Sequence, residues 1–216
     1  MFQRVMAGLR EKQKTDRDRR IVEAASRLFL ESGYEGVKIE TIAAQAGVSG
    51  GTIYNYYQNK GDVLVAVVSL EVNEVIAAGE DVISNPPTDP ANAVNALFGI
   101  YLRHSLHYLS KEMWRAAMSI STLHPESPLG RHYTKLDADL CRQVCALLAK
   151  LKARGAVHSR VDTEMAGRIL FNNMNMMFID FVKDEEMDIE VVVNAVAEQS
   201  SMIISALASS GSEACP

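Results

Sequence analysis

Long hydrophobic segments are missing from this 216-residue chain. The longest largely apolar run, residues 63–70, is far shorter than the ~20 residues that a helix needs to cross a bilayer. The N-terminal segment also lacks the continuous apolar stretch of a secretory signal. We therefore expect a cytoplasmic protein with no membrane partner, in which the 48% of hydrophobic residues form a packed core.

Cysteine is scarce, and the three cysteines, Cys141, Cys145 and Cys215, cannot build a disulfide framework. No Cys or His spacing typical of a zinc site is present, so the sequence predicts no metal and no cofactor. Cys141 and Cys145 stand four residues apart in a predicted helix and share one face. We interpret them as small apolar residues of a helix contact, with redox sensing as the alternative.

Catalytic motifs are missing as well. The chain shows no Ser/His/Asp grouping, no paired acid motif and no glycine-rich phosphate loop. We therefore expect a protein that is not an enzyme.

Charge is distributed unevenly along the chain, whose formal net charge is −5. Residues 1–60 contain ten Lys and Arg against seven Asp and Glu, whereas the remainder contains twelve against twenty. This asymmetry indicates an end that faces nucleic acid and a body that phosphate repels, with a solvated tail as the alternative. The basic residues gathered near the start are Arg4, Arg10, Lys12, Lys14, Arg17, Arg19 and Arg20.

Apolar residues recur at three- and four-residue steps almost throughout, which predicts an all-α fold of about nine helices. We expect an N-terminal basic arm and three-helix, helix-turn-helix head in residues 1–62, and a helical body in residues 63–216. The expected helices are 16–31, 39–46, 50–57, 61–84, 91–109, 112–123, 131–154, 163–183 and 188–209. Their ends rest on Ser49, Asp89 and Asp162 as N-caps and on Gly33 and Gly47 as C-caps.

Residues 39–57 carry the pattern of a helix-turn-helix. Gly47 permits a sharp turn between two short helices, and Ile53 and Tyr57 anchor the second helix at i,i+4 spacing. Two helices this short bury little surface alone, so they need the preceding helix as a platform. An ordinary turn between two packing helices is the alternative reading.

The second helix of this motif places its N-terminal part in the major groove. Gly50 and Gly51 cost helix stability, by ~1 kcal/mol each relative to alanine, and a bare backbone that approaches DNA closely explains that cost. Thr52 and Asn55 can contact base edges. We assign Tyr54 and Lys60 to phosphate, which positions the protein without specifying sequence.

The head also shows a specific residue pattern, which runs without a gap from Gly33 to Leu64. It comprises Gly33, Tyr34, Gly36, Ile42, Ala43, Ala46, Gly47, Val48, Ser49, Gly51, Thr52, Ile53, Tyr54, Tyr56, Tyr57, Lys60, Asp62 and Leu64. This pattern closely resembles the head of the TetR (tetracycline-repressor-like) regulators. The resemblance implies a homodimer that binds double-stranded, palindromic operator DNA, usually as a repressor released by a small molecule. It also implies DNA contacts at Ser49, Gly50, Thr52, Tyr54, Asn55, Tyr56 and Lys60.

One position departs from the family pattern. The family usually caps the first helix of the motif with Ser or Thr, where this sequence has Lys38. A lysine cannot accept the capping hydrogen bond, but its ammonium can reach a phosphate. We therefore assign Lys38 to the DNA backbone.

The last two predicted helices are apolar on several sides and must be buried on several sides. The family resemblance implies that such helices form a four-helix dimer interface, whereas an internal bundle without dimerisation is the alternative. The residues that we expect in the interface are Ile169, Met177, Phe178, Phe181, Val192, Val196, Ile203 and Leu207.

The central helices are expected to hold a small-molecule effector. Their apolar, aromatic and methionine content favours a largely hydrophobic ligand, and Arg103 or Arg115 can meet an acidic group on it. His104, His107 and Glu112 hint at a metal, but we favour unrelated helix polar residues. An effector-independent or partner-regulated DNA-binding protein on the same fold is the alternative function. The candidate effector residues are Tyr101, Arg103, His104, His107, Tyr108, Trp114, Arg115, Met118, Asn172, Asn173 and Met176.

Overall fold

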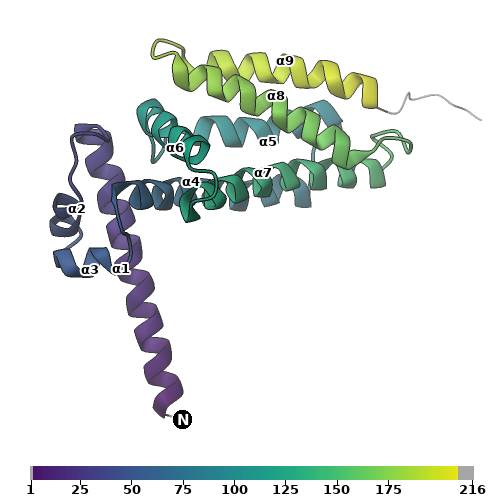
Figure 1. Cartoon of the computed structure of the whole chain (residues 1–216). Helices are drawn as coiled ribbons and strands as arrows, with labels where there is room; N and C mark the ends of the chain where they lie inside the picture. The colour runs from purple at the N-terminus through teal and green to yellow at the C-terminus, as the bar shows by residue number, and fades with distance from the viewer. Residues whose placement is uncertain (1, 209–216) are drawn as a thin grey trace, which may run out of the picture. The chain divides into compact units, whose positions relative to one another are not determined.

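The computed structural model describes residues 2–208, with side chains from residue 12 onward, and this part of the chain is all-α (Figure 1). The prediction of about nine helices is confirmed for the described range. Val157 and Ala208 form an isolated bridge, and no strand occurs among these residues. The helices are α1 (Phe2–Ser32), α2 (Ile39–Gln45), α3 (Gly50–Tyr54), α4 (Lys60–Ser84), α5 (Pro90–His104), α6 (Lys111–Leu123), α7 (Pro128–Ala153), α8 (Thr163–Lys183) and α9 (Ile189–Leu207).

Side-chain caps fix three helix starts where the sequence predicted them. Ser49, Asp89 and Asp162 each accept a backbone N–H from the first turn of α3, α5 and α8, respectively. Gly33 follows α1 with φ +74°, and Gly47 lies in the turn after α2 with φ +65°. Both glycines therefore occupy the left-handed region, and their predicted role in ending these helices is confirmed.

Two helices of the head differ in length from the prediction. α1 begins at Phe2 rather than near Asp16, and no proline interrupts residues 2–32. α3 ends at Tyr54 rather than Tyr57. The N–H groups of Tyr56 and Tyr57 both donate to the carbonyl of Ile53, so the regular i,i−4 pattern of the helix does not continue.

Two further boundaries moved for local reasons. α5 ends at His104 instead of residue 109, and there the hydroxyl of Ser105 bonds the carbonyl of Leu102 at 2.7 Å. α7 begins at Pro128 instead of residue 131, because the Oγ of Ser127 accepts the N–H of Gly130 and caps it. The predicted helix end at residue 209 lies outside the described residues.

The chain divides into two compact units that interleave along the sequence. The first unit holds residues Met1–Glu71 and His107–Tyr133, and the second holds Val72–Leu106 and Thr134–Pro216. α4 and α7 each contribute one part to either unit. Because α6 belongs with α1–α3, these units do not follow a single boundary after residue 62, and the division of function at that point stays a prediction.

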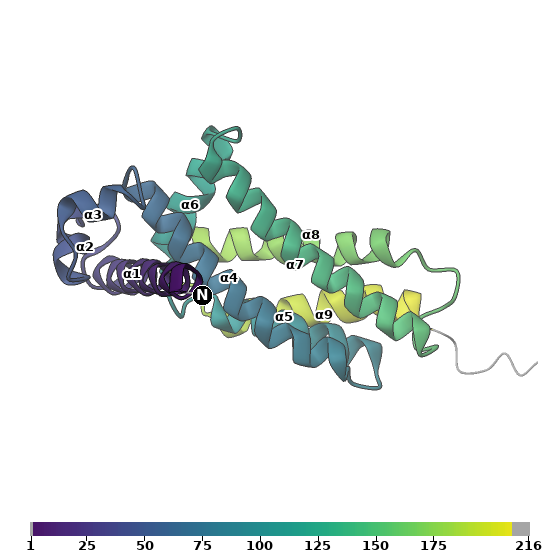
Figure 2. The same cartoon turned by 90° about the horizontal axis from the view of Figure 1, so that it is seen from below.

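Each unit has its own apolar core. In the first unit, Phe29 of α1 is buried together with Ile42 of α2 and Ile53 of α3. In the second unit, α9 packs on both α5 and α8, and the three helices lie side by side in Figures 1 and 2. Phe181 of α8 and Val196 of α9 are buried there. Among the described residues, no helix combines the length and apolar character that a transmembrane segment requires.

Candidate nucleic-acid interface

α2 and α3 are held on α1 by a small apolar core and one strong polar contact. Ile42 and Ile53 are fully buried, and Tyr57 donates its hydroxyl proton to Asp18 of α1 at 2.6 Å. Burial, first of all, and the Asp18 carboxylate raise the pKa of Tyr57, so the phenol stays protonated at neutral pH. Sequence reasoning missed this anchor, because Asp18 stands 39 residues away in a run of solvated charges.

The connection between α2 and α3 is a tight turn held by backbone hydrogen bonds. The N–H of Val48 bonds the carbonyl of Ala43 at 3.0 Å across Gly47. Ser49 then caps α3, with its Oγ accepting the N–H of Thr52 at 3.1 Å. These contacts fix the angle between the two helices, which makes the segment a helix-turn-helix.

The outer start of α3 is open, and its two glycines serve no contact within the described chain. A Cβ added at Gly50 or Gly51 would meet nothing within 4 Å, and neither residue has positive φ. The fold therefore does not require glycine at either place, although glycine costs the helix ~1 kcal/mol at each. A partner that approaches the backbone closely at this point accounts for both residues.

Of the two predicted base-reading residues, Thr52 directly follows the glycine pair and Asn55 is the C-cap at the other end of α3. Asn55 is exposed, and its side chain forms no hydrogen bond within the described range. Thr52 is half-buried, and its Oγ1 lies 2.8 Å from the Oγ of Ser49. Asn55 is thus ready for an external partner, whereas Thr52 has to share its hydroxyl with the cap.

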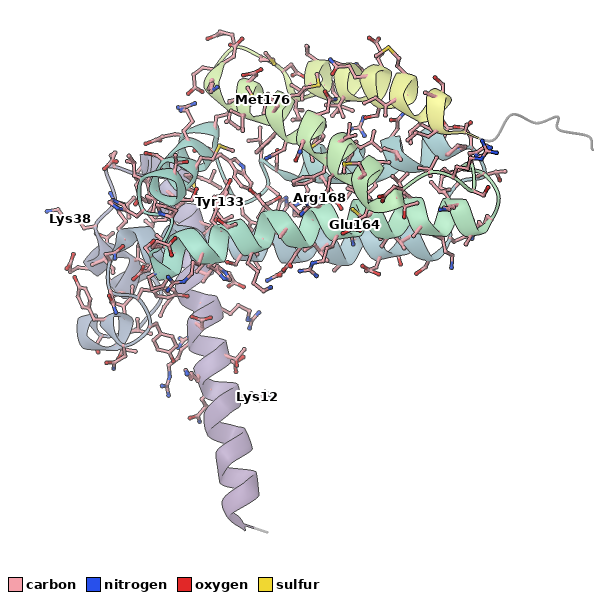
Figure 3. The ribbon with its side chains drawn as sticks, turned by 45° about the vertical axis from the view of Figure 1, so that its right-hand side comes forward. Lys12, Lys38, Tyr133, Glu164, Arg168 and Met176 are labelled. Atoms are coloured by element: carbon pink, nitrogen blue, oxygen red, sulfur yellow. The ribbon has the colours of Figure 1, made fainter. Side chains whose placement is uncertain are left out.

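The predicted phosphate-binding residues fall into two groups. Lys38 is exposed, forms no cap for α2 and extends away from the head (Figure 3). In contrast, Tyr54 donates to Glu40 at 2.9 Å. This hydrogen bond raises the pKa of Tyr54. The pKa of Glu40 is lowered, mainly by a hydrogen bond from its own backbone N–H and secondly by the bond from Tyr54. Tyr56 donates to the carbonyl of Lys14 at 3.4 Å.

Lys60 is engaged inside its own unit. Its ammonium donates to the carbonyls of Tyr34 at 2.8 Å and Glu35 at 3.2 Å, and lies 4.3 Å from the centroid of the Tyr34 ring. The side chain is only 24% exposed, so in this geometry it fastens the loop after α1. Its contact with phosphate remains a prediction that has to compete with these bonds.

The structure distributes the eleven candidate effector residues over both units. His107, Tyr108, Trp114, Arg115 and Met118 belong to the first unit, and the other six belong to the second. The first unit has a hollow of about 600 Å³ between the segments 56–62 and 120–129, and none of the eleven residues lines it. The pocket assignment therefore stays a prediction.

Four of the six candidates in the second unit have partners within that unit, and one of them, Asn173, donates to the Sδ of Met177 at 3.9 Å. Tyr101 is buried and donates to Gln143 at 2.6 Å. The exposed guanidinium of Arg103 pairs with Glu190 through two bonds of 2.7 and 2.9 Å. His104 lies 3.5 Å from Glu74.

The remaining candidates and Asn173 differ in exposure. Trp114 is buried and the ring of His107 packs edge-on against Tyr108. Asn172 and Met176 of α8 are exposed, whereas Asn173 is half-buried. His104 and His107 fall in different units, and no group of metal-binding side chains occurs among the described residues.

The candidate dimer residues separate into a buried and an exposed set. Phe178, Phe181, Val192 and Val196 lie in the core of the second unit. Met177, Ile203 and Leu207 are half-buried, and Ile169 is 50% exposed. The exposed apolar residues of α8 and α9 are Met165, Ile169, Met176, Val191 and Met202, and Figure 3 labels Met176 among them.

Comparisons with known proteins agree with this site. The family model for bacterial regulatory proteins of the tetR family matches residues 21–67, which contain α2, α3 and their turn. The fatty acid metabolism regulator protein of Bacillus subtilis is 23% identical over 188 residues, which make up 87% of this chain and 95% of that protein.

Solved structures show the same fold. A TetR-family regulator from Mesorhizobium loti superimposes with a TM-score of 0.69 at 20% identity, over 89% of this chain and 97% of that one. FadR of Thermus thermophilus, a TetR-family repressor solved with lauroyl-CoA, gives a TM-score of 0.67 at 19% identity, over 92% and 98% of the two chains. Together with the helix-turn-helix and its open glycine pair, these matches identify the chain as a DNA-binding transcriptional regulator of the TetR family.

Proposed function

We propose that this protein is a homodimeric repressor that binds a palindromic operator through α3 of each protomer. A small molecule with a long apolar chain, of the fatty acyl thioester class, releases it from the operator. The open start of α3, where a Cβ added at Gly50 or Gly51 would meet nothing within 4 Å, is the observation that carries the proposal.

Base reading follows from the exposed groups at the start of α3 and at Asn55, which directly follows it. The N-terminal part of a recognition helix meets base edges in the major groove. Gly50 and Gly51 let the backbone approach, and Asn55 presents an amide that suits the edge of adenine. Lys38 lies on the same helix-turn-helix and supplies a contact to phosphate, which fixes the register of the protein on the duplex.

The exposed residues of α8 and α9 support the homodimer. A helix of five residues reads only a few base pairs, so a specific operator needs a second copy. Met165 and Ile169 on α8 and Met202 on α9 are between 50% and 70% exposed, and contact with a second copy would remove them from water.

Two relatives support the class of effector. One is named a fatty acid metabolism regulator, and the other was solved with lauroyl-CoA. An acyl-CoA ligand combines a long apolar chain with an anionic headgroup. The hydrophobic effector expected from the central helices agrees with the acyl chain.

Selection of bound sequences from random duplex DNA tests the first half of the proposal. We expect an inverted repeat whose half-sites lie about one helical turn apart or a multiple of it. Asn55→Ala and Thr52→Ala then relax the preference at one base pair of each half-site, at a cost of about 1–3 kcal/mol. Equal weakening on all sequences would argue against base contact by these residues.

Fluorescence anisotropy with the selected operator tests the second half. Lauroyl-CoA is expected to dissociate the complex, whereas free coenzyme A at the same concentration leaves it intact. If acyl-CoAs and free fatty acids of all chain lengths leave the complex intact, the effector class is wrong. The effector-independent regulator then becomes the better reading.

A further inference from the structure

α1 is longer than the head requires. From residue 12 onward, where side chains are described, its buried residues begin at Ile21, and the contacts of Asp18 with Tyr57 and of the Lys14 carbonyl with Tyr56 come before them. All residues from 12 to 17 are exposed. Figure 1 shows that α1 continues past α3 as a rod that no other element of the first unit accompanies. We call residues 2–20 the arm.

The arm is basic, and three of its cations are available to a partner, whereas Arg19 pairs with Glu23 at 3.6 Å. Residues 12–20 contain five Lys and Arg against two Asp. Lys12, Lys14 and Arg17 form no ion pair or side-chain hydrogen bond within the described residues. One of the two acids, Asp18, already holds the hydroxyl of Tyr57. Figure 3 shows Lys12 on the part of α1 that stands alone in the first unit.

The arm is continuous with the DNA-reading surface. Tyr56, which follows α3, touches the backbone of Lys14. Nη1 of Arg20 lies 3.7 Å from the position that a Cβ on Gly47 would occupy, so this guanidinium flanks the turn of the helix-turn-helix. The positive side chains therefore begin beside the turn that presents α3 and extend outward from it.

The length of the arm determines what it meets. The twelve residues from 2 to 13 add about 18 Å of helix at 1.5 Å per residue. The major groove is only about 12 Å wide. With α3 in that groove, a rod that passes beside it and reaches further comes to the sugar-phosphate strand that borders the groove.

We propose that the arm lies along the phosphates next to each half-site and widens the protein's contact with DNA beyond the bases that α3 reads. This inference rests on the proposed function, in which α3 occupies the major groove. The partner is the DNA backbone rather than a protein, because the arm presents unpaired cations beside the DNA-reading helix, and the contact carries no sequence information.

A triple substitution, Lys12→Gln, Lys14→Gln and Arg17→Gln, tests the arm. The matched control is Lys135→Gln, Lys150→Gln and Lys183→Gln, which removes three exposed charges from the second unit. We expect the arm variant to lower the slope of log K against log salt by about two to three units. The control leaves the slope near that of the wild type. The base preference of the arm variant stays unchanged.

A second variant, in which residues 2–13 are deleted, tests the arm without removing any described buried residue, and hydroxyl-radical footprinting gives a second measurement. The footprint of this deletion variant is expected to lose protection only at the outer flanks. A wild-type footprint for the deletion, or equal slopes for the arm variant and its control, would overturn the inference.

The outcomes also separate the two proposals. Loss of dimer in sedimentation for the arm variant, with an unchanged salt slope, would assign the arm to a second copy instead and overturn the DNA contact. Operator binding that survives unchanged in Asn55→Ala and Thr52→Ala together contradicts base reading by α3, whatever the arm does.

Discussion

At Gly50 and Gly51, the residue that favours DNA binding is not the residue that would favour stability of the fold. The chain places no atom within 4 Å of a Cβ at either position, so alanine fits without strain. Gly50→Ala and Gly51→Ala are expected to raise the free energy of unfolding by up to about 1 kcal/mol each. Operator affinity falls, because the added methyl groups hold the backbone away from DNA. Chemical denaturation and anisotropy measure the two effects, and unchanged affinity would leave the glycine pair without an explanation.

Two lysines of the head are expected to differ in what alanine changes: the stability of the fold at Lys60 and the binding of DNA at Lys38. Lys60→Ala removes the donor to the carbonyls of Tyr34 and Glu35, which costs the fold about 1 kcal/mol. Lys38→Ala leaves stability unchanged, because its side chain is exposed and caps nothing. We expect Lys38→Ala to lower the salt slope of operator binding by about one unit. A destabilised Lys38→Ala with the wild-type slope would show that Lys38 serves the fold.

Asp137 of α7 links stability to pH. Burial raises the pKa of this carboxyl to about 6, above its value in the unfolded chain. A raised folded-state pKa in an acid means that its contribution to stability is fully present below about pH 4 and is lost as pH rises through about 6. Asp137→Asn is therefore expected to add about 1–3 kcal/mol at pH 7 and almost nothing at pH 4. Urea denaturation of the wild type and of Asp137→Asn at both pH values measures this difference in the free energy of unfolding.

At the scale of elements, side-chain capping predicted where three of the helices begin. Ser49, Asp89 and Asp162 accept backbone N–H groups at the predicted helix starts. The start of α1 could not be predicted in this way, because a run of alternating charges reads equally as a solvated tail and as an exposed helix. Similarly, periodicity gives no sign of the end of α5 at His104, where Ser105 is the C-cap and its hydroxyl bonds the carbonyl of Leu102.

The close contact of α7 and α8 explains why Cys145 of α7 is a small residue. A Cβ at Gly167 of α8 would lie 2.6 Å from Sγ of Cys145, so the helices approach closely where both residues are small. Burial raises the pKa of Cys145 to about 12, which keeps its thiol protonated and unreactive at neutral pH. The interpretation of Cys145 as a packing residue fits this geometry, and Cys215 lies outside the described residues.

The candidate site was predictable only where local pattern determines geometry. The turn at Gly47 and the cap at Ser49 follow from neighbouring residues, and the structure has both. The bonds that occupy Lys60 and Tyr54 join residues 14 to 26 positions apart, and sequence spacing gives no sign of them. For α8 and α9, periodicity showed apolar residues on several sides but not which side faces the chain's own core.

At the scale of the whole molecule, the uneven distribution of charge along the sequence fits a protein that binds DNA through its head. Residues 1–60 carry the basic excess, and the remaining sequence carries an acidic excess large enough to make the whole chain negative. Phosphate attracts the first and repels the second, so charge favours encounters in which the head leads. Such steering weakens as salt rises, because screening shortens the range of both effects.

The two sets of apolar residues on α8 and α9 allow a test of the dimer that a single substitution would not provide. Val196 is 1% exposed within its own chain, so Val196→Asp buries an unpaired carboxylate and is expected to unfold the second unit. Ile169 is 50% exposed, and a charge there costs the isolated chain little. Ile169→Glu is therefore expected to keep the wild-type helix content while it separates the protomers and abolishes tight operator binding. Asn92→Glu, which adds the same charge to the exposed first turn of α5, is the matched control.

Sedimentation velocity at micromolar concentration, with circular dichroism and operator binding on the same samples, distinguishes these outcomes. We expect dimers for the wild type and Asn92→Glu, folded monomers for Ile169→Glu and loss of helix for Val196→Asp. A dimeric Ile169→Glu would move the interface to another surface. A wild-type monomer that binds its operator tightly would contradict the symmetric arrangement altogether, because a single five-residue helix then supplies the whole specificity that we assign to two.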